Sequence, residues 1–250
     1  MLFKNDFLYG NYTAGSNFWS NEKCDSTNAV AKRMILDGEA LNCSSLVGSI
    51  ITSREQYSGY GTNGRSWQSP VGNLYVSIIL PIDIVDRTRI GQLSLATSIA
   101  VANSIKFRFG VENVAVKWPN DILIGTEKVA GILIEIEKEF AVVGIGVNVE
   151  NAPETGQPTT CLRTHCPRDI ALDDVLPVIL KELDCAYCQL LNHNFEEIKE
   201  NWTAMCPDFR NYVKREGVAG IFVAIGESGE MILKSKDGPS EKLEKVFSNG

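Results

Sequence analysis

Histidine is scarce in this chain, which contains only two. Neither His165 nor His193 lies near a motif that would supply a nucleophile, so we interpret both as surface or loop residues. The seven cysteines are an odd number without the spacing of a disulfide framework. Cys185 and Cys188 have metal-ligand spacing, but no second pair or histidine cluster completes a four-ligand set. The sequence therefore predicts reduced cysteines and no protein-bound metal.

Basic residues are outnumbered, with 24 lysines and arginines against 31 aspartates and glutamates and a net charge of −7. No basic cluster offsets this balance, which argues against a nucleic-acid partner. Long apolar runs are missing too, because nothing has the length of a signal-peptide core or a membrane span. We therefore expect no membrane partner and a cytoplasmic location. The 250 residues, 44% of them hydrophobic, can form one large domain or a large and a small one.

Glycine is concentrated between two predicted strands, in the segment Arg-Glu-Gln-Tyr-Ser-Gly-Tyr-Gly-Thr-Asn-Gly-Arg-Ser-Trp-Gln-Ser-Pro at residues 54–70. Gly59, Gly61 and Gly64 have the spacing Gly-x-Gly-x-x-Gly. A dinucleotide-binding fingerprint must open a helix, whereas a strand follows here, so that interpretation fails. Two alternatives stay open, a phosphate-binding loop and an ordinary hairpin loop.

Periodicity and capping residues predict the other elements. Four N-cap candidates, Asp25 to Asn28, precede a helix at 29–37. Further helices are predicted at 91–107, 170–191 and 195–205, and strands at 18–23, 46–52, 73–80, 114–118, 128–135 and 142–149. Short strands at 211–213, 218–225, 231–234 and 243–247 predict a small SH3-like β-barrel. The fold class is thus α+β, a mixed sheet flanked by helices, with a large domain over residues 1–207 and a β domain over 208–250.

Lys117 is unusual because it ends an apolar strand just before Trp118 and Pro119. A partly buried lysine is costly unless an anion compensates its charge. Strand alternation could instead turn the side chain to solvent. The pattern alone favours neither interpretation.

Five motifs, in this order, resemble those of the biotin protein ligases. They are Asp25-Ser26-Thr27-Asn28; Gln56 with Gly-x-Gly-x-x-Gly-Arg-x-Trp-x-Ser-Pro at 59–70; Lys117-Trp-Pro-Asn-Asp; Lys128-Val-Ala-Gly-Ile-Leu; and Gly144-Ile-Gly-Val-Asn148. The motifs cover roughly residues 18–150, and the C-terminal barrel matches by shape alone. Larger members carry an N-terminal DNA-binding winged helix, for which too few residues precede the first motif, so the resemblance is to the ligase-only class. It implies a catalytic domain like those of class II aminoacyl-tRNA synthetases and biotin ligases over residues 1–207.

The resemblance implies two half-reactions. Biotin and ATP, with Mg²⁺, give biotinyl-5′-AMP and pyrophosphate, and a lysine of a biotin carboxyl carrier protein or domain then accepts the biotinyl group. Lys117 and Arg65 would be the catalytic cations. The implied biotin-binding residues are Ser26, Thr27, Asn28, Gln56, Tyr60, Gly61, Thr62 and Lys117. The implied nucleotide-binding residues are Gly59, Gly64, Arg65, Trp67, Asn120, Lys128 and Asn148.

The chain departs from the family at two loop positions, and alternatives to biotin ligation stay open. Tyr60 and Thr62 stand where many members have arginine, so either the adenylate is held less tightly or these residues contribute only backbone N–H groups. A lipoate or octanoyl ligase of the same fold is one competing function, which the full Lys-Trp-Pro-Asn-Asp motif disfavours. A non-catalytic module that binds biotin or the carrier is another, which Lys117 and Arg65 disfavour. A homodimer is a further possibility.

Overall fold

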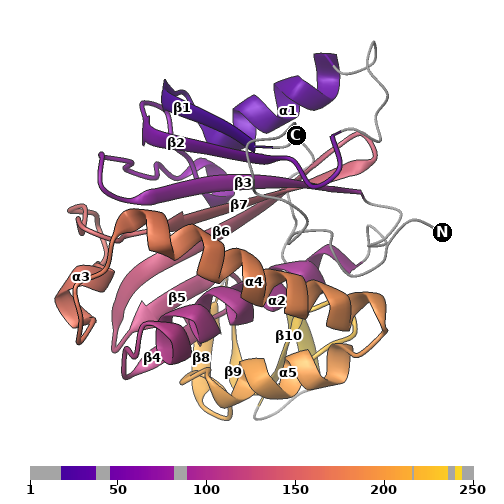
Figure 1. Cartoon of the computed structure of the whole chain (residues 1–250). Coiled ribbons are helices and arrows are strands. Elements are labelled where there is room, and N and C mark those ends of the chain that lie inside the picture. Colours follow the sequence, from indigo (N-terminus) through magenta and orange to yellow (C-terminus); the bar gives the residue numbers. More distant parts are fainter. Residues whose placement is uncertain (1–17, 38–45, 82–88, 216, 236–239, 244–250) are drawn as a thin grey trace.

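The computed structural model describes residues 18–37, 46–81, 89–215, 217–235 and 240–243. Its centre is a seven-stranded mixed sheet with the strand order β1-β2-β3-β7-β6-β5-β4 (Figure 1). The strands are β1 (Phe18–Cys24), β2 (Ile50–Gln56), β3 (Leu74–Pro81), β4 (Val114–Lys117), β5 (Asp121–Ile124), β6 (Glu127–Glu137) and β7 (Phe140–Val147). β1 pairs with β2 in parallel, and the other neighbours are antiparallel. The predicted mixed sheet is therefore confirmed.

Helices cover the two faces of this sheet unequally. On one face α1 (Thr27–Asp37) packs against side chains that include Ile51, Ile79 and Val142. On the other face lie α2 (Ile90–Asn103) and α4 (Leu172–Leu191) (Figure 1). α1 covers only part of the sheet face on which it packs. The carboxyl half of β7 and the neighbouring part of β6 remain uncovered by helices, and the cleft lies there.

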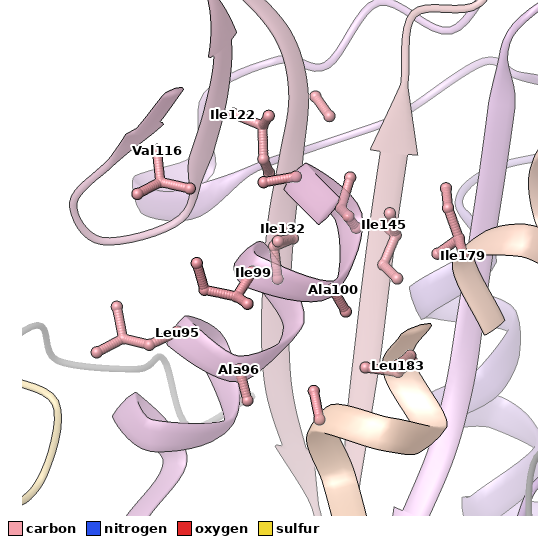
Figure 2. Close-up of a cluster of buried hydrophobic side chains, with 14 of the residues drawn as sticks. Leu95, Ala96, Ile99, Ala100, Val116, Ile122, Ile132, Ile145, Ile179 and Leu183 are labelled. Atoms are coloured by element: carbon pink, nitrogen blue, oxygen red, sulfur yellow. The ribbon is translucent and has the colours of Figure 1, made fainter. Parts of the chain in front are cut away.

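The main core lies between the sheet and the α2–α4 pair. In Figure 2 small and branched residues of α2, among them Ala96, Ile99 and Ala100, face Ile132 and Ile145 of the sheet. All of these side chains are buried, and alanines let the helix approach the sheet closely. α2 continues into a π-helical turn at Ser104–Arg108, so the predicted helix over 91–107 has one irregular end.

Two shorter helices complete the chain before the C-terminal strands, α3 (Leu162–His165) and α5 (Phe195–Ala204). None of the helices within the described ranges combines the length and apolar character that a membrane crossing needs.

The C-terminal segment forms a four-stranded antiparallel sheet in the order β11-β10-β9-β8. Its strands are β8 (Tyr212–Arg215), β9 (Val218–Ile225), β10 (Met231–Lys234) and β11 (Ser240–Leu243); residues 244–247 of the last predicted strand lie outside the described residues. Within the described ranges no ladder joins β8 to β11, so the predicted SH3-like barrel is not closed.

This small sheet covers its apolar side by packing on the rest of the molecule. Phe222 is fully buried and makes edge-to-face contacts with Trp202 of α5 and with Phe209, at ring-centroid distances of 6.3 and 5.4 Å. Trp118 Nε1 donates to Gly229 O at 3.1 Å. The small sheet thus shields its apolar side by packing against α5 and the large sheet, and not by closing into a barrel. The boundary between residues 207 and 208 stays a prediction, since one hydrophobic core runs across it.

Candidate functional site

A cleft of about 560 Å³ opens on the α1 face of the large sheet, beside the N-terminus of that helix. Its walls come from α1, the glycine loop (residues 57–66), the β4–β5 turn, β6 and β7. Most residues predicted as site residues line it: Ser26, Thr27, Asn28, Gln56, Tyr60, Gly61, Thr62, Arg65, Trp67, Lys117, Asn120, Lys128 and Asn148. The two exceptions are Gly59 and Gly64.

Gly59 and Gly64 shape the loop without reaching the cleft. A Cβ on Gly59 would collide with Trp67 O and lie 2.6 Å from Ser69 Oγ. Gly64 has a φ of +67°, a left-handed conformation that favours glycine. The loop is a small hairpin, in which Gly61 N donates to Arg65 O at 2.7 Å and Trp67 N to Gly59 O at 2.9 Å. The segment is thus a hairpin that lines the cleft, and phosphate binding by it stays a prediction.

One end of the cleft is a network of uncharged polar groups at the start of α1. Gln56 Oε1 accepts from Thr27 N at 2.8 Å and from Thr27 Oγ1 at 3.2 Å, and Gln56 Nε2 donates to Ser69 Oγ at 2.8 Å. Ser77 Oγ lies 2.5 Å from Asn28 Oδ1 and 2.8 Å from Thr27 Oγ1. Each side chain is therefore fixed in orientation by its neighbours, which is how a site for a small polar ring is preorganised.

A buried carboxylate on β6, Glu135, adjoins this network. Its side chain accepts from Asn28 Nδ2 and Tyr60 OH, both at 2.8 Å, and pairs with Lys32 Nζ at 2.9 Å. Burial, reinforced by the neighbouring Glu135 charge, raises the pKa of Tyr60 well above its usual range. Tyr60 is therefore a neutral hydrogen-bond donor at every physiological pH.

The indole of Trp67 lies against glycines of β6 and β7. A Cβ on Gly146 would come within 2.7 Å of the indole, and one on Gly131 within 3.2 Å. Lys128 Nζ stands 5.1 Å from the ring centroid, within range of a cation–π contact. Trp67 Nε1 is buried and has no hydrogen-bond partner within the described ranges.

Four cationic side chains line the cleft, Arg65, Lys117, Lys128 and Arg215. Lys128 pairs with Asp121 at 2.6 Å, and Arg215 pairs with Asp208 at 2.6 Å. Within the part of the chain that the structure describes, neither Lys117 nor Arg65 forms an ion pair, so both are available to an anion. Lys117 is half-buried while Val116 points into the core, so strand alternation turns the lysine into the cleft.

Two asparagines complete the cleft and bond mainly to backbone. The Asn120 amide donates to Ile132 O, and Asn148 Nδ2 donates to Thr160 O at 3.0 Å. Asn148 Oδ1 is buried without a partner among the described residues, although a buried acceptor normally has one.

Sequence reasoning missed other residues in or beside the cleft, among them Glu135, Ser77 and Arg215. Glu135 had a signal, because it is a charge within the apolar run of β6 in the same way that Lys117 is in β4. Ser77 lies in an otherwise apolar strand, β3, and is fully buried. Arg215 had no signal, since its strand pattern is that of an ordinary exposed hairpin.

Comparisons with known proteins agree with this geometry. Residues 25–150 match the family model described as the Biotin/lipoate A/B protein ligase family. A biotin--[acetyl-CoA-carboxylase] ligase of Paracoccus denitrificans is 30% identical in an alignment of 234 positions that covers 86% of this chain and 93% of the relative. The bifunctional ligase/repressor BirA of Bacillus subtilis is 28% identical over 84% of this chain and 67% of its own length.

A solved structure extends the likeness to nearly the whole chain. The biotin protein ligase from Aquifex aeolicus in complex with biotin and ATP has a TM-score of 0.78 and 25% identity, covering 94% of this chain and 97% of its own. The five sequence motifs, the fold and the cleft that the motifs line therefore all indicate the same family. This chain belongs to the Biotin/lipoate A/B protein ligase family, among the biotin protein ligases.

Proposed function

We propose that the protein joins biotin to ATP to give biotinyl-5′-AMP and pyrophosphate, and then transfers the biotinyl group to a lysine of a biotin carboxyl carrier protein or domain. The observation that carries the proposal is that Lys117 and Arg65, two cations without ion pairs in the described residues, line the same cleft as the polar network of Thr27, Asn28 and Gln56. One end suits a neutral polar ring, and the other suits anions.

The first half-reaction requires cationic groups between its two anionic reactants. The biotin carboxylate must approach the α-phosphate of ATP, and the repulsion between them raises the barrier. Lys117 and Arg65 would neutralise part of the charge that develops as the carboxylate oxygen bonds to phosphorus and pyrophosphate leaves. Because they make no ion pair in the described structure, they need not break one first.

The polar network fits the ureido ring of biotin, which offers one carbonyl acceptor and two N–H donors. Ser26, Thr27, Asn28 and Gln56 supply both donors and acceptors there, and Gly61 and Thr62 of the glycine loop line the same cleft. The loop residue Tyr60 would cover the ring. A preorganised set of this kind loses little entropy when the ligand binds.

The opposite end fits an adenine ring. The Trp67 indole offers an aromatic surface, and Asn148 Oδ1 is a buried acceptor that lacks a donor. An exocyclic amino group would satisfy that acceptor, so the orphaned atom supports a role for Asn148 in nucleotide binding. Asn120 and Lys128 would complete this end, and Gly59 and Gly64 would contribute through the loop that they shape.

Mg²⁺ fits the proposal as the counterion of ATP. Among the described residues no group of three or more histidine, cysteine, aspartate or glutamate side chains could hold a metal ion. Mg²⁺ commonly binds phosphate oxygens and water with only one or two carboxylates, which is compatible with this cleft. The ion would reduce the charge of the polyphosphate as it binds. The same proposal places the reaction in the cytoplasm, together with ATP and the carrier.

The test is an incubation of the protein with ATP, Mg²⁺ and either labelled biotin or labelled lipoate, with and without an apo carrier domain. We expect pyrophosphate release and label transfer with biotin, and no transfer with lipoate. Transfer of lipoate would identify the alternative ligase. Binding of biotin without pyrophosphate release would identify a non-catalytic binding module.

A further inference from the structure

Glu135 joins three parts of the cleft wall that are distant in sequence. Its carboxylate is 4% exposed, on β6, and it receives one hydrogen bond from α1 through Asn28, one from the glycine loop through Tyr60, and an ion pair from Lys32. A carboxylate buried this deeply destabilises the fold unless each oxygen is paired. Here Asn28 and Tyr60 share Oε2, and Lys32 holds Oε1.

The bond from Tyr60 is the side-chain link between the glycine loop and β6. Between residues 57 and 66, which the structure describes without a gap, Tyr60 is the one residue whose side chain hydrogen-bonds to another element. The remaining loop hydrogen bonds are between backbone atoms: those of Gly61 and Trp67 lie within the hairpin. At the base of the loop, Tyr57 N and Ser58 N donate to Cys24 O and Asp25 O, both at 3.0 Å, but neither bond reaches β6. Loss of the Tyr60 hydroxyl would therefore free the loop from β6 without altering the hairpin itself.

The same carboxylate fixes the orientation of the Asn28 amide. Because Nδ2 donates to Glu135, Oδ1 is directed to Ser77 Oγ, and Gly144 leaves room for it, since a Cβ there would collide with Oδ1. The polar end of the cleft and the loop at its side are thus held by one group.

We propose that Glu135 is a positioning residue that holds the glycine loop over the cleft through Tyr60 and sets the orientation of the Asn28 amide. The inference rests on the proposed function, in which the loop and Asn28 contact biotin and its adenylate. Glu135 itself need not touch the substrate, and Lys32 compensates its charge from outside the cleft. The consequence is that retention of the adenylate depends on a bond between two protein groups.

The test compares Tyr60→Phe, Glu135→Gln and the double variant with the wild type. A hydrogen bond to a charged group, once lost, should accelerate adenylate release by about 10-fold or more in Tyr60→Phe. Ligand-free Tyr60→Phe should also be cut faster by trypsin after the exposed Arg65. The double variant should release the adenylate no faster than Glu135→Gln, because both changes break the same bond.

Tyr57→Phe is the matched control, since Tyr57 is a neighbouring tyrosine that is 66% exposed. It should behave as the wild type in both measurements. Wild-type adenylate release and wild-type cleavage in Tyr60→Phe would overturn the inference, as would fully additive effects in the double variant. If Glu135→Gln does not fold, Tyr60→Phe alone decides. If the wild type forms no adenylate, the proposed function fails. The trypsin measurement still tests whether the Tyr60–Glu135 hydrogen bond holds the loop.

Discussion

Lys117 and Glu135 are charged residues in two apolar strands of the same sheet, and both lie at the cleft. Lys117 has no ion pair among the described residues, whereas Glu135 has a complete set of donors. In the proposed function, the group that meets a ligand charge is left without an ion pair, and the group that shapes the site already has its hydrogen-bond partners.

We expect Lys117→Ala to abolish most adenylate formation while leaving the fold intact. Loss of a charged hydrogen bond at the reacting phosphate should cost about 2 to 4 kcal/mol in barrier, roughly 30- to 1000-fold in rate. Pyrophosphate release measures the effect, and the circular dichroism spectrum checks the fold. A variant with near wild-type release would show that Lys117 is not a catalytic cation. Lys106→Ala, a change at an exposed lysine, is the control.

The start of α1 carries a stability that depends on pH. Asp25 accepts from Arg33 at 2.6 and 2.8 Å and from Ser26 N at 2.8 Å. The hydrogen bonds from Arg33 hold the pKa of the Asp25 carboxyl below its usual range, although burial opposes them. A lowered folded-state pKa adds stability above the unfolded-state value, and this stability is lost as the pH falls through the folded-state value.

We therefore expect Asp25→Asn to lower the free energy of unfolding at pH 7 by about 0.5 to 1 kcal/mol, a small effect because Arg33 is largely exposed to solvent. The difference from the wild type should shrink below about pH 4 and vanish once Asp25 is protonated. Urea unfolding at pH 7 and at pH 3 measures it. A difference that stays constant between the two pH values would contradict the ionic origin.

At the scale of elements, the sequence predicted most helices and strands but not all of their ends. The strand predicted at 46–52 is β2 at Ile50–Gln56, because Gly48 adopts a φ of +77° in a turn and Glu55 and Gln56 continue the pairing with β1. Within the described residues the predicted barrel is an open antiparallel sheet, since short alternating strands do not reveal whether a sheet closes on itself or packs on a neighbour. Most of the predicted site residues do line the cleft, since their motifs are local in sequence, whereas Arg215 reaches it only through tertiary packing.

The glycine loop should respond to ligands, which is a prediction at this same scale. Three glycines increase the conformational entropy of the open loop, so biotin and ATP contacts must contribute to its ordering. Trypsin cleavage between Arg54 and Arg65 should slow when both ligands are present, as followed by mass spectrometry. Cleavage at the same rate with and without ligands would count against this. Cleavage at sites outside the loop serves as the internal reference.

At the scale of the whole molecule, the C-terminal sheet contributes to the cleft through Arg215. Its side chain is 30% exposed, and its Nε atom is buried without a partner among the described residues. The neighbouring Trp118 is tied to Gly229 of the same sheet. Changes in the small sheet can therefore affect the cationic side chains of the cleft.

We expect Arg215→Ala to raise the KM for ATP by about fivefold, because a partly exposed cation contributes on the order of 1 kcal/mol to anion binding. Biotin affinity should not change, since the polar network lies on α1, β2 and β3. Steady-state kinetics and biotin titration measure the two quantities. The adjacent exposed residue in β8 provides the control, Lys214→Ala. Equal ATP KM values in both variants would show that Arg215 does not act on the nucleotide.

The order of strands in the large sheet has a consequence during translation. β3 is buried along its whole length and pairs with β7, so that Pro81 lies opposite Phe140 and Leu74 opposite Val147. The ribosome makes β7 about 60 residues after β3, which takes about 3 to 12 seconds at ~5–20 residues per second. For that interval the edge of β3 that later pairs with β7 has no partner strand, even if β2 is already in place on the other side. An apolar strand with an open edge is the kind of segment that chaperones bind and that aggregates when they are absent.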